Sequence, residues 1–294
     1  ASTGGSDSGL RPPIVRGDAL VLDFGATYFS VLPGEGGRVD AFGASKATNL
    51  LTGSDNHPDF WGSTFWTSPQ SEMEWPPPAA LDTEPYEGTF EGNRLTLLSG
   101  VIDYNPGLLR VTKIFEADPT EAAVHVTYRM SNEGEAEASL AGWEVTRVAG
   151  GGLSFFPTGD AAFTPDGTDL PVEQASGVTW YDSTADTNTG VSKKLNADGA
   201  EGWLAHVAGD FVFIKVFADL PLAEQANGEG EVEIYAAPAG DGGYVELENQ
   251  GGYGPIAPGS SKNYEVTWLV RELPGNVTVE VGSASLLEFV RAQL

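Results

Sequence analysis

The chain has 294 residues, no cysteine, and 42 Asp and Glu against 15 Lys and Arg, which gives a formal net charge of -27. This charge excludes nucleic acid and anionic membrane surfaces as main partners, because both would be repelled. The lack of cysteine excludes disulfides, thiolate nucleophiles and cysteine-ligated zinc. The 38 glycines and 19 prolines favour many short strands joined by turns.

Residues 1–12 are expected to form a flexible tether ahead of a single domain over residues 13–294. The segment Ala1–Gly9 is small and polar, as after removal of a signal segment, although a chain trimmed for expression would begin in the same way. The expected location is therefore exported: periplasmic, attached to the outer surface as a lipoprotein, or secreted. No stretch is long and apolar enough to span a membrane.

Many segments alternate apolar and polar residues with the period of a β-strand. In Val124–Met130 the residues Val124, Val126, Tyr128 and Met130 are expected on one face. The other predicted strands are Leu109–Phe115, Phe211–Phe217, Glu231–Tyr235, Tyr244–Gln250 and Tyr264–Val270. A short helix is expected in Ser283–Leu294. Because no βαβ alternation, repeat or internal linker is present, the pattern predicts an all-β fold, a single large antiparallel sandwich.

The segment Asp59–Tyr86 breaks the strand pattern. It holds several tryptophans, Gln70 and three consecutive prolines at 76–78. A long, proline-stiffened loop is costly to order without a function. Trp66 and Trp75 offer flat apolar faces on which a sugar ring stacks, and Gln70 between them offers hydrogen bonds. The alternative is that these tryptophans close one end of the core.

The strand Tyr244–Gln250 is the strongest candidate for a binding surface. Its period of two places Tyr244, Glu246, Glu248 and Gln250 on one face. Carboxylates accept hydrogen bonds strongly, and sugar hydroxyls both donate and accept them, so this face suits a carbohydrate. The alternative is a polar face exposed to solvent.

The run Leu247–Gln250 (Leu-Glu-Asn-Gln), followed by Pro258-Gly259 and by Tyr264 in an apolar strand, resembles the C-terminal end of aldose 1-epimerases, or galactose mutarotases. In that family the Glu of a similar run is the general base that takes the proton of the anomeric hydroxyl. The resemblance implies this role for Glu248. It also implies a galactose mutarotase-like supersandwich with a sugar site on a concave sheet face.

Two further segments, Asp59–Tyr86 and Gly142–Arg147, look more like an uncharacterised bacterial branch of the galactose mutarotase-like superfamily, domain of unknown function 4380. The likeness runs from about Val21 to Arg291. Mutarotases also carry a catalytic His in an Asn-His-x-Tyr-Phe motif, and the corresponding place here, Leu140–Val145, has none. Glu144 is the candidate replacement for that acid, provided that burial or a second carboxylate raises its pKa.

Three other residues are candidates for substrate binding. His206 follows a tryptophan and opens a strand pair, Lys215 interrupts an apolar strand, and Arg147 lies close to Glu144 in sequence. Lys215 must snorkel, pair with a carboxylate or face a polar cavity. Arg147 is either an ion-pair partner or a group that binds an acidic sugar. The structural interpretation of His206, as a core residue, stays open.

Two functions fit these observations better than a purely structural surface protein, which the polar strand face and the aromatic segment disfavour. One is a carbohydrate-active enzyme, an epimerase, lyase or hydrolase, with Glu248 as base and Glu144 as acid in a cleft shared with Arg147 and Lys215. The other is a non-catalytic, exported protein that binds a mono- or oligosaccharide on the tryptophan loop. No cofactor and no metal site are expected, because three scattered histidines form no ligand motif. The oligomeric state stays open.

Overall fold

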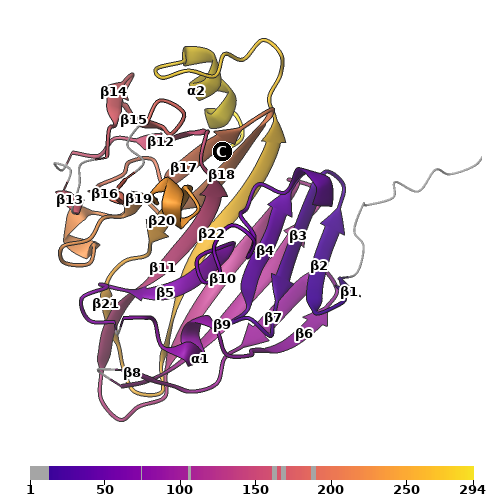
Figure 1. The fold of residues 1–294 in the computed structure, drawn as a ribbon. Coiled ribbons are helices and arrows are strands. Elements are labelled where there is room, and N and C mark those ends of the chain that lie inside the picture. Colours follow the sequence, from indigo (N-terminus) through magenta and orange to yellow (C-terminus); the bar gives the residue numbers. More distant parts are fainter. Residues whose placement is uncertain (1–12, 74, 105–106, 161–163, 167–169, 187–189) are drawn as a thin grey trace, which may run out of the picture.

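The computed structural model describes residues 13–73, 75–104, 107–160, 164–166, 170–186 and 190–294. Within this part of the chain, two sheets of 11 strands each pack face to face (Figure 1). Every strand pair described is antiparallel, so the predicted all-β antiparallel sandwich is confirmed. The tether predicted for residues 1–12 lies outside the described residues.

The first sheet combines the first five strands of the described chain with strands from its later part. In spatial order its strands are β1 (Ile14–Arg16), β2 (Ala19–Phe24), β3 (Thr27–Leu32), β4 (Arg38–Gly43), β5 (Ser63–Ser68), β11 (Ala138–Ala149), β20 (Tyr244–Gln250), β19 (Val232–Ala236), β16 (Lys193–Ala197) and β13 (Thr164–Asp166), with β21 (Gly254–Ile256) paired to β11. Strand β11 pairs with β5 on one side and with β20 on the other. The segment Asp59–Tyr86 was expected to be a loop, but Ser63–Ser68 within it forms β5. Because β5 pairs with β11, it lies one strand away from β20.

The second sheet contains most of the strands predicted in the middle of the sequence. In spatial order its strands are β14 (Glu173–Ala175), β15 (Val178–Asp182), β12 (Leu153–Pro157), β17 (Trp203–Ala208), β18 (Phe211–Phe217), β22 (Ser261–Glu272), β10 (Ala123–Asn132), β9 (Gly107–Asp118), β7 (Arg94–Leu98) and β6 (Glu87–Glu91), with β8 (Ile102–Tyr104) paired to β9. In β10, Val124, Val126, Tyr128 and Met130 are buried while Arg129 is exposed, as the alternation predicts.

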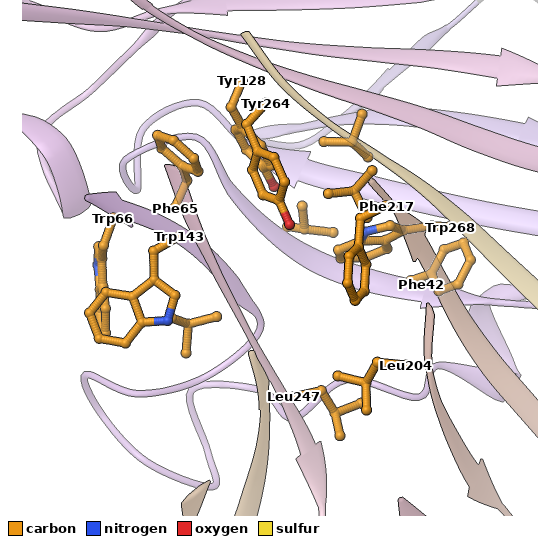
Figure 2. Packing of buried hydrophobic residues seen from close by; sticks show 14 of the residues in the cluster. Phe42, Phe65, Trp66, Tyr128, Trp143, Leu204, Phe217, Leu247, Tyr264 and Trp268 are labelled. Carbon is orange, nitrogen blue, oxygen red and sulfur yellow. The ribbon is translucent and has the colours of Figure 1, made fainter. Parts of the chain in front are cut away.

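Aromatic side chains from the two sheets meet in one core. Phe42 of the first sheet lies 5.0 Å from Phe213 and 5.1 Å from Trp268 of the second, measured between ring centroids. Figure 2 shows part of this packing, with Phe42 beside Trp268. Burial of apolar surface on this scale is the main stabilising term of such a sandwich.

The described helices are few and short. They are α1 (Ala79–Asp82), α2 (Ala284–Arg291) and the 3-10 helices η1 (Lys46–Thr48), η2 (Leu222–Glu224) and η3 (Ala239–Asp241). Helix α2 confirms the predicted C-terminal helix and buries Leu286, Leu287 and Val290 against a second cluster beside β12, β15 and β17. Its N-cap Ser283 accepts a hydrogen bond from the Leu286 amide at 3.2 Å. Among the described helices, none has the length and hydrophobicity needed to cross a membrane.

Candidate functional site

The first sheet carries a row of carboxylates on the face turned away from the second sheet. Thr146 of β11 accepts a hydrogen bond from Lys215 of β18 at 3.0 Å, so Thr146 faces the second sheet. Its neighbour Arg147 therefore faces away, and the register sets Arg147 opposite Glu246 of β20. Glu248 lies two residues further along β20 and shares that face, as the period of two predicts.

The segment Asp59–Tyr86 lines a cavity of about 320 Å³ on this face. Its lining residues are Phe60, Trp66, Gln70, Trp75, Trp143, Ser192, Lys193, Lys194, Tyr235, Tyr244 and Glu246. We call it the aromatic cavity. It brings together Trp66 of β5 and Gln70 and Trp75 of the following loop with Glu246 of β20. Six of its eleven lining residues are aromatic, which is the composition expected of a site for a small organic ligand.

The tryptophans of the cavity are held in fixed relative positions. Trp66 lies 5.3 Å from Trp143 and 5.8 Å from Trp75 between ring centroids, both edge to face. Figure 2 shows Trp66 and Trp143 side by side. Trp66 is 3% exposed and donates from Nε1 to Asp82 Oδ1 at 2.7 Å, whereas Trp75 is 55% exposed and stacks on Phe60. Trp75 therefore offers the accessible aromatic face.

Glu248 is fully buried and is not part of the cavity lining. Its Oε2 accepts hydrogen bonds from Trp143 Nε1 at 2.8 Å and from Lys194 Nζ at 3.2 Å. Lys194 also pairs with Glu233 Oε2 at 2.7 Å. Burial works against the charged lysine, but the two carboxylates outweigh it and raise the pKa of Lys194. Glu248 thus contacts the cavity through two residues of its wall.

Glu246 is the carboxylate that lines the cavity directly. Its Oε1 accepts a hydrogen bond from Arg147 Nε at 2.7 Å. Burial and the negative charge of Glu248 nevertheless raise the pKa of Glu246 to about 7, because together they outweigh the attraction of Arg147. Glu246 is thus the carboxyl group of the cavity whose charge changes near neutral pH.

Arg147 is fully buried and acts as an ion-pair partner. Besides Glu246 it contacts Thr64 Oγ1 through Nη1 at 3.1 Å, and its guanidinium lies 5.1 Å from the ring centroid of Trp66. A guanidinium held by a carboxylate, a hydroxyl and an aromatic ring fixes the positions of the side chains around it. Of the two predicted roles for Arg147, the structure shows the ion pair.

Glu144 and Lys215 lie between the two sheets. Lys215 Nζ is 2.8 Å from Glu144 Oε2, and both side chains are almost completely buried. Glu144 Oε1 also accepts a hydrogen bond from the Tyr128 hydroxyl at 2.7 Å, and Trp268 Nε1 donates to the same carboxylate at 3.1 Å. This is a hydrogen-bonded ion pair inside the core, the arrangement that a buried charge requires.

The prediction that Glu144 and Lys215 share a cleft with Glu248 is therefore wrong. In the register of β11 and β20, Glu144 lies opposite Asn249, whereas Glu248 lies opposite Val145. Because side chains alternate along a strand, this offset of one residue puts the two glutamates on opposite faces of the same sheet. Burial outweighs Glu144 in its effect on Lys215 and lowers the pKa of the lysine.

His206 also faces the interior and does not line the aromatic cavity. Its Nδ1 lies 2.9 Å from Ser154 Oγ, and burial lowers its pKa to about 4. The imidazole is therefore neutral at neutral pH. The interpretation of His206 as a core residue fits this placement better than contact with a substrate.

Several residues of the site were not singled out from the sequence. Lys194 of β16 and Tyr235 of β19 line the cavity, and Glu233, which is outside the lining, forms an ion pair with Lys194. The sequence shows that β19 alternates, but the neighbour of each strand depends on the sheet order. Trp143 lies in the Gly142–Arg147 run, where it could be recognised only as one large aromatic among several.

One group of side chains in the described residues has ligand atoms close enough to hold a metal ion. Asp118, Glu121 and His125, at the turn between β9 and β10, lie within 4.8 Å of one another. His125 Nε2 is 3.6 Å from Asp118 Oδ2, and Asp118 Oδ1 accepts hydrogen bonds from the amides of Thr120 and Glu121. None of the three ligand residues lines the aromatic cavity.

Comparison with solved structures identifies the fold. Neither a model of a protein family nor a curated protein matches the sequence. Solved structures match over most of the chain. A galactose mutarotase-like protein from Clostridium acetobutylicum is 9% identical, with a TM-score of 0.59 over 91% of this chain and 100% of the other. One from Lactobacillus casei is 11% identical, with a TM-score of 0.58 over 86% and 100%.

This chain has the galactose mutarotase-like fold. A galactose mutarotase related enzyme from Lactobacillus acidophilus, 8% identical, matches it with a TM-score of 0.55 over 88% of this chain and 99% of the other. The supersandwich expected from the resemblance is therefore confirmed. Assignment to the branch of unknown function 4380 stays a prediction.

Proposed function

We propose that this protein binds a saccharide in the aromatic cavity. The observation that carries the proposal is the combination of the exposed Trp75 ring with Glu246, Lys194 and Gln70 in the lining of one cavity. A sugar ring presents C–H faces that pack on an aromatic ring and a rim of hydroxyls that need both donors and acceptors. The cavity supplies the ring, a carboxylate acceptor, an ammonium donor and an amide that does both.

The hydroxyls of Tyr235 and Tyr244 add neutral donors. Burial raises the pKa of both tyrosines, so the two phenols stay protonated at neutral pH. The similar structures named galactose mutarotase-like support a ligand of this class, since they share the fold over nearly their whole length. Fold similarity alone does not assign a ligand, and the cavity side chains are the stronger argument.

A second candidate function is proton transfer on the bound sugar, as in mutarotation. It is favoured by the pKa of Glu246, which burial raises to about 7, near the value that suits a general base at neutral pH. In this reaction the Glu246 carboxylate takes the proton of the anomeric hydroxyl. Glu248, the base implied by the sequence resemblance, is screened from the cavity by Trp143 and Lys194.

Calorimetric titration with a panel of mono- and oligosaccharides tests binding. Trp75→Ala is expected to lower the affinity about tenfold, or ~1.4 kcal/mol, through loss of stacking. Phe90→Ala is the matched control, because Phe90 of β6 is an aromatic ring of similar exposure, 51%, that does not line the cavity. If no sugar binds, or if both variants bind as the wild type does, the proposal fails.

Exchange between the anomers of a bound sugar, followed by NMR, tests the second candidate. Glu246→Gln is expected to slow the exchange by about a hundredfold or more if Glu246 is the base. Glu91→Gln, at an exposed position of β6, serves as the control. Binding without any acceleration of exchange by the wild type excludes this candidate and leaves the binding function in place.

A further inference from the structure

A second cavity adjoins the aromatic cavity and shares part of its wall. It has a volume of about 380 Å³. Its lining residues are Asn56, Ala149, Gly150, Gly151, Tyr181, Ser183, Asp186, Val191, Lys193, Ala236, Ala237, Ala239, Gly242, Gly243, Tyr244 and Val245. Lys193 and Tyr244 belong to both linings. We call this space of about 380 Å³ the second cavity. Lys193 and Tyr244 are the first residues of β16 and β20, so the two spaces meet at this end of the first sheet.

The lining of the second cavity contains polar groups of the kind that bind sugar hydroxyls. Lys193 Nζ donates to Asp186 Oδ1 at 2.5 Å, and the Tyr181 hydroxyl donates to Asp186 Oδ2 at 3.0 Å. Asn56 Nδ2 is buried and makes no hydrogen bond within the described residues. A buried amide donor without a partner costs free energy, and a ligand hydroxyl at this wall removes that cost.

Glycines allow backbone segments to meet closely at the second cavity. At Gly150 a Cβ atom would lie 2.5 Å from the carbonyl oxygen of Gly243, closer than two such atoms approach. At Gly242 it would lie 2.7 Å from Asn56 Nδ2, and the backbone there has φ of +93°, which favours glycine. Backbone segments thus meet closely around this space, and no large side chain from these positions fills it.

The charges in both cavities are already balanced in pairs. Glu246 pairs with Arg147, and Asp186 pairs with Lys193. Lys194, the remaining cation of the lining, pairs with Glu233 and Glu248. Within the described linings no cation is left for an acidic sugar, and a net charge of -27 repels anions from the whole chain. The linings therefore suit uncharged sugar units.

From these observations we propose that the ligand is a neutral oligosaccharide with adjacent units in the aromatic cavity and the second cavity. The inference rests on the proposed saccharide-binding function and names its ligand class. Each cavity lies near the lower end, about 300 Å³, of the usual volume of small-molecule sites, and together they suit a longer ligand. A unit linked to one already bound enters its cavity at a high effective concentration, so the linkage raises the affinity.

The test compares calorimetric affinities for a neutral monosaccharide and for its α- and β-linked di- and trisaccharides. Wild-type protein is expected to bind one disaccharide series at least about tenfold tighter than the monosaccharide. Ala239→Phe places a large ring at an exposed position of the second cavity, and Asn56→Ala removes its unpaired amide. Both variants are expected to bring the ratio of the two affinities close to one, whereas Ala136→Phe, at an exposed position outside both linings, keeps it.

Each outcome decides between the two proposals. Equal affinity of the wild type for monosaccharide and oligosaccharides overturns the inference but leaves the saccharide-binding function intact. A ratio that Ala239→Phe and Asn56→Ala both leave unchanged, with thermal unfolding showing that the variants are folded, also overturns it. If no saccharide of any length binds, the proposed function itself fails, and the inference fails with it.

Discussion

Replacement of Glu246 by Gln changes the pH dependence of stability in a direction that the structure fixes. Glu246 is 9% exposed, and burial raises its pKa in the folded protein from the ordinary 4.5 to about 7. Between these two values the folded state therefore holds a proton on Glu246 that the unfolded state has released. The free energy of unfolding contributed by this group falls as the pH rises through this interval, because the unfolded state binds fewer protons.

The size of the effect follows from the two pKa values. At about 1.4 kcal/mol per pH unit, the interval from 4.5 to about 7 corresponds to about 3 kcal/mol. Residue 246 cannot titrate in Glu246→Gln, so only the wild type loses this free energy as the pH rises. The unfolding free energy of the variant should therefore increase by about 3 kcal/mol relative to that of the wild type over this interval. Using the difference removes the contribution of other buried acids such as Glu231, whose pKa burial raises to about 8.

Urea unfolding followed by tryptophan fluorescence at intervals between about pH 4.5 and pH 8 provides the measurement. Glu91→Gln, the same substitution at an exposed position of β6, is the control. A constant difference between Glu246→Gln and the wild type over this range would show that the pKa of Glu246 is not raised. Glu246 would then lack the raised pKa that favours it as a general base near neutral pH.

The remaining predictions concern the interior. Lys215→Met is expected to destabilise the fold by about 3–5 kcal/mol, because it leaves Glu144 buried and unpaired. Adding Glu144→Gln to the same chain should recover most of this loss. Thermal unfolding that shows no recovery in the double variant would contradict the prediction. Burial lowers the pKa of His206 to about 4. The free energy of unfolding should therefore fall by about 3 kcal/mol as the pH drops from about 6.5 towards 4. Acid unfolding curves of His206→Gln should lack this loss.

Local patterns were sufficient to predict six of the strands, although many others, such as β5, were not predicted. The alternation in Val124–Met130 and Phe211–Phe217 reflects a property of each segment alone, and both segments are strands at those positions. The common face of Glu246 and Glu248 followed from the same period. The helix at the C-terminal end was readable from its apolar side chains, such as Leu286.

Local patterns could not predict which face of a sheet meets the second sheet. Glu144 and Arg147 are three residues apart in one strand, so they lie on opposite faces, but nothing local shows which face meets the second sheet. Lys215 looked like a cavity residue because an isolated lysine in an apolar strand needs a partner. The structure supplies this partner inside the core, through a contact between residues 71 positions apart in sequence.

The composition of the site depended on the order of strands. Lys194 and Tyr235 lie in different segments, and they meet Trp75 only because β16 and β19 follow β20 in the first sheet. Long-range strand pairing of this kind leaves no signal in a single sequence. The segment Asp59–Tyr86 could still be recognised as unusual from its proline and tryptophan content, but the strand β5 within it, Ser63–Ser68, was not predicted.

The most direct test of the central claim is a crystal structure of the protein soaked with the tightest saccharide of the calorimetric panel. We expect one sugar ring to stack on Trp75, with a hydroxyl within hydrogen-bond distance of the Glu246 carboxylate. A sugar that binds elsewhere and leaves the aromatic cavity empty, for example in the hollow lined by Val216 and Tyr264, would contradict the account.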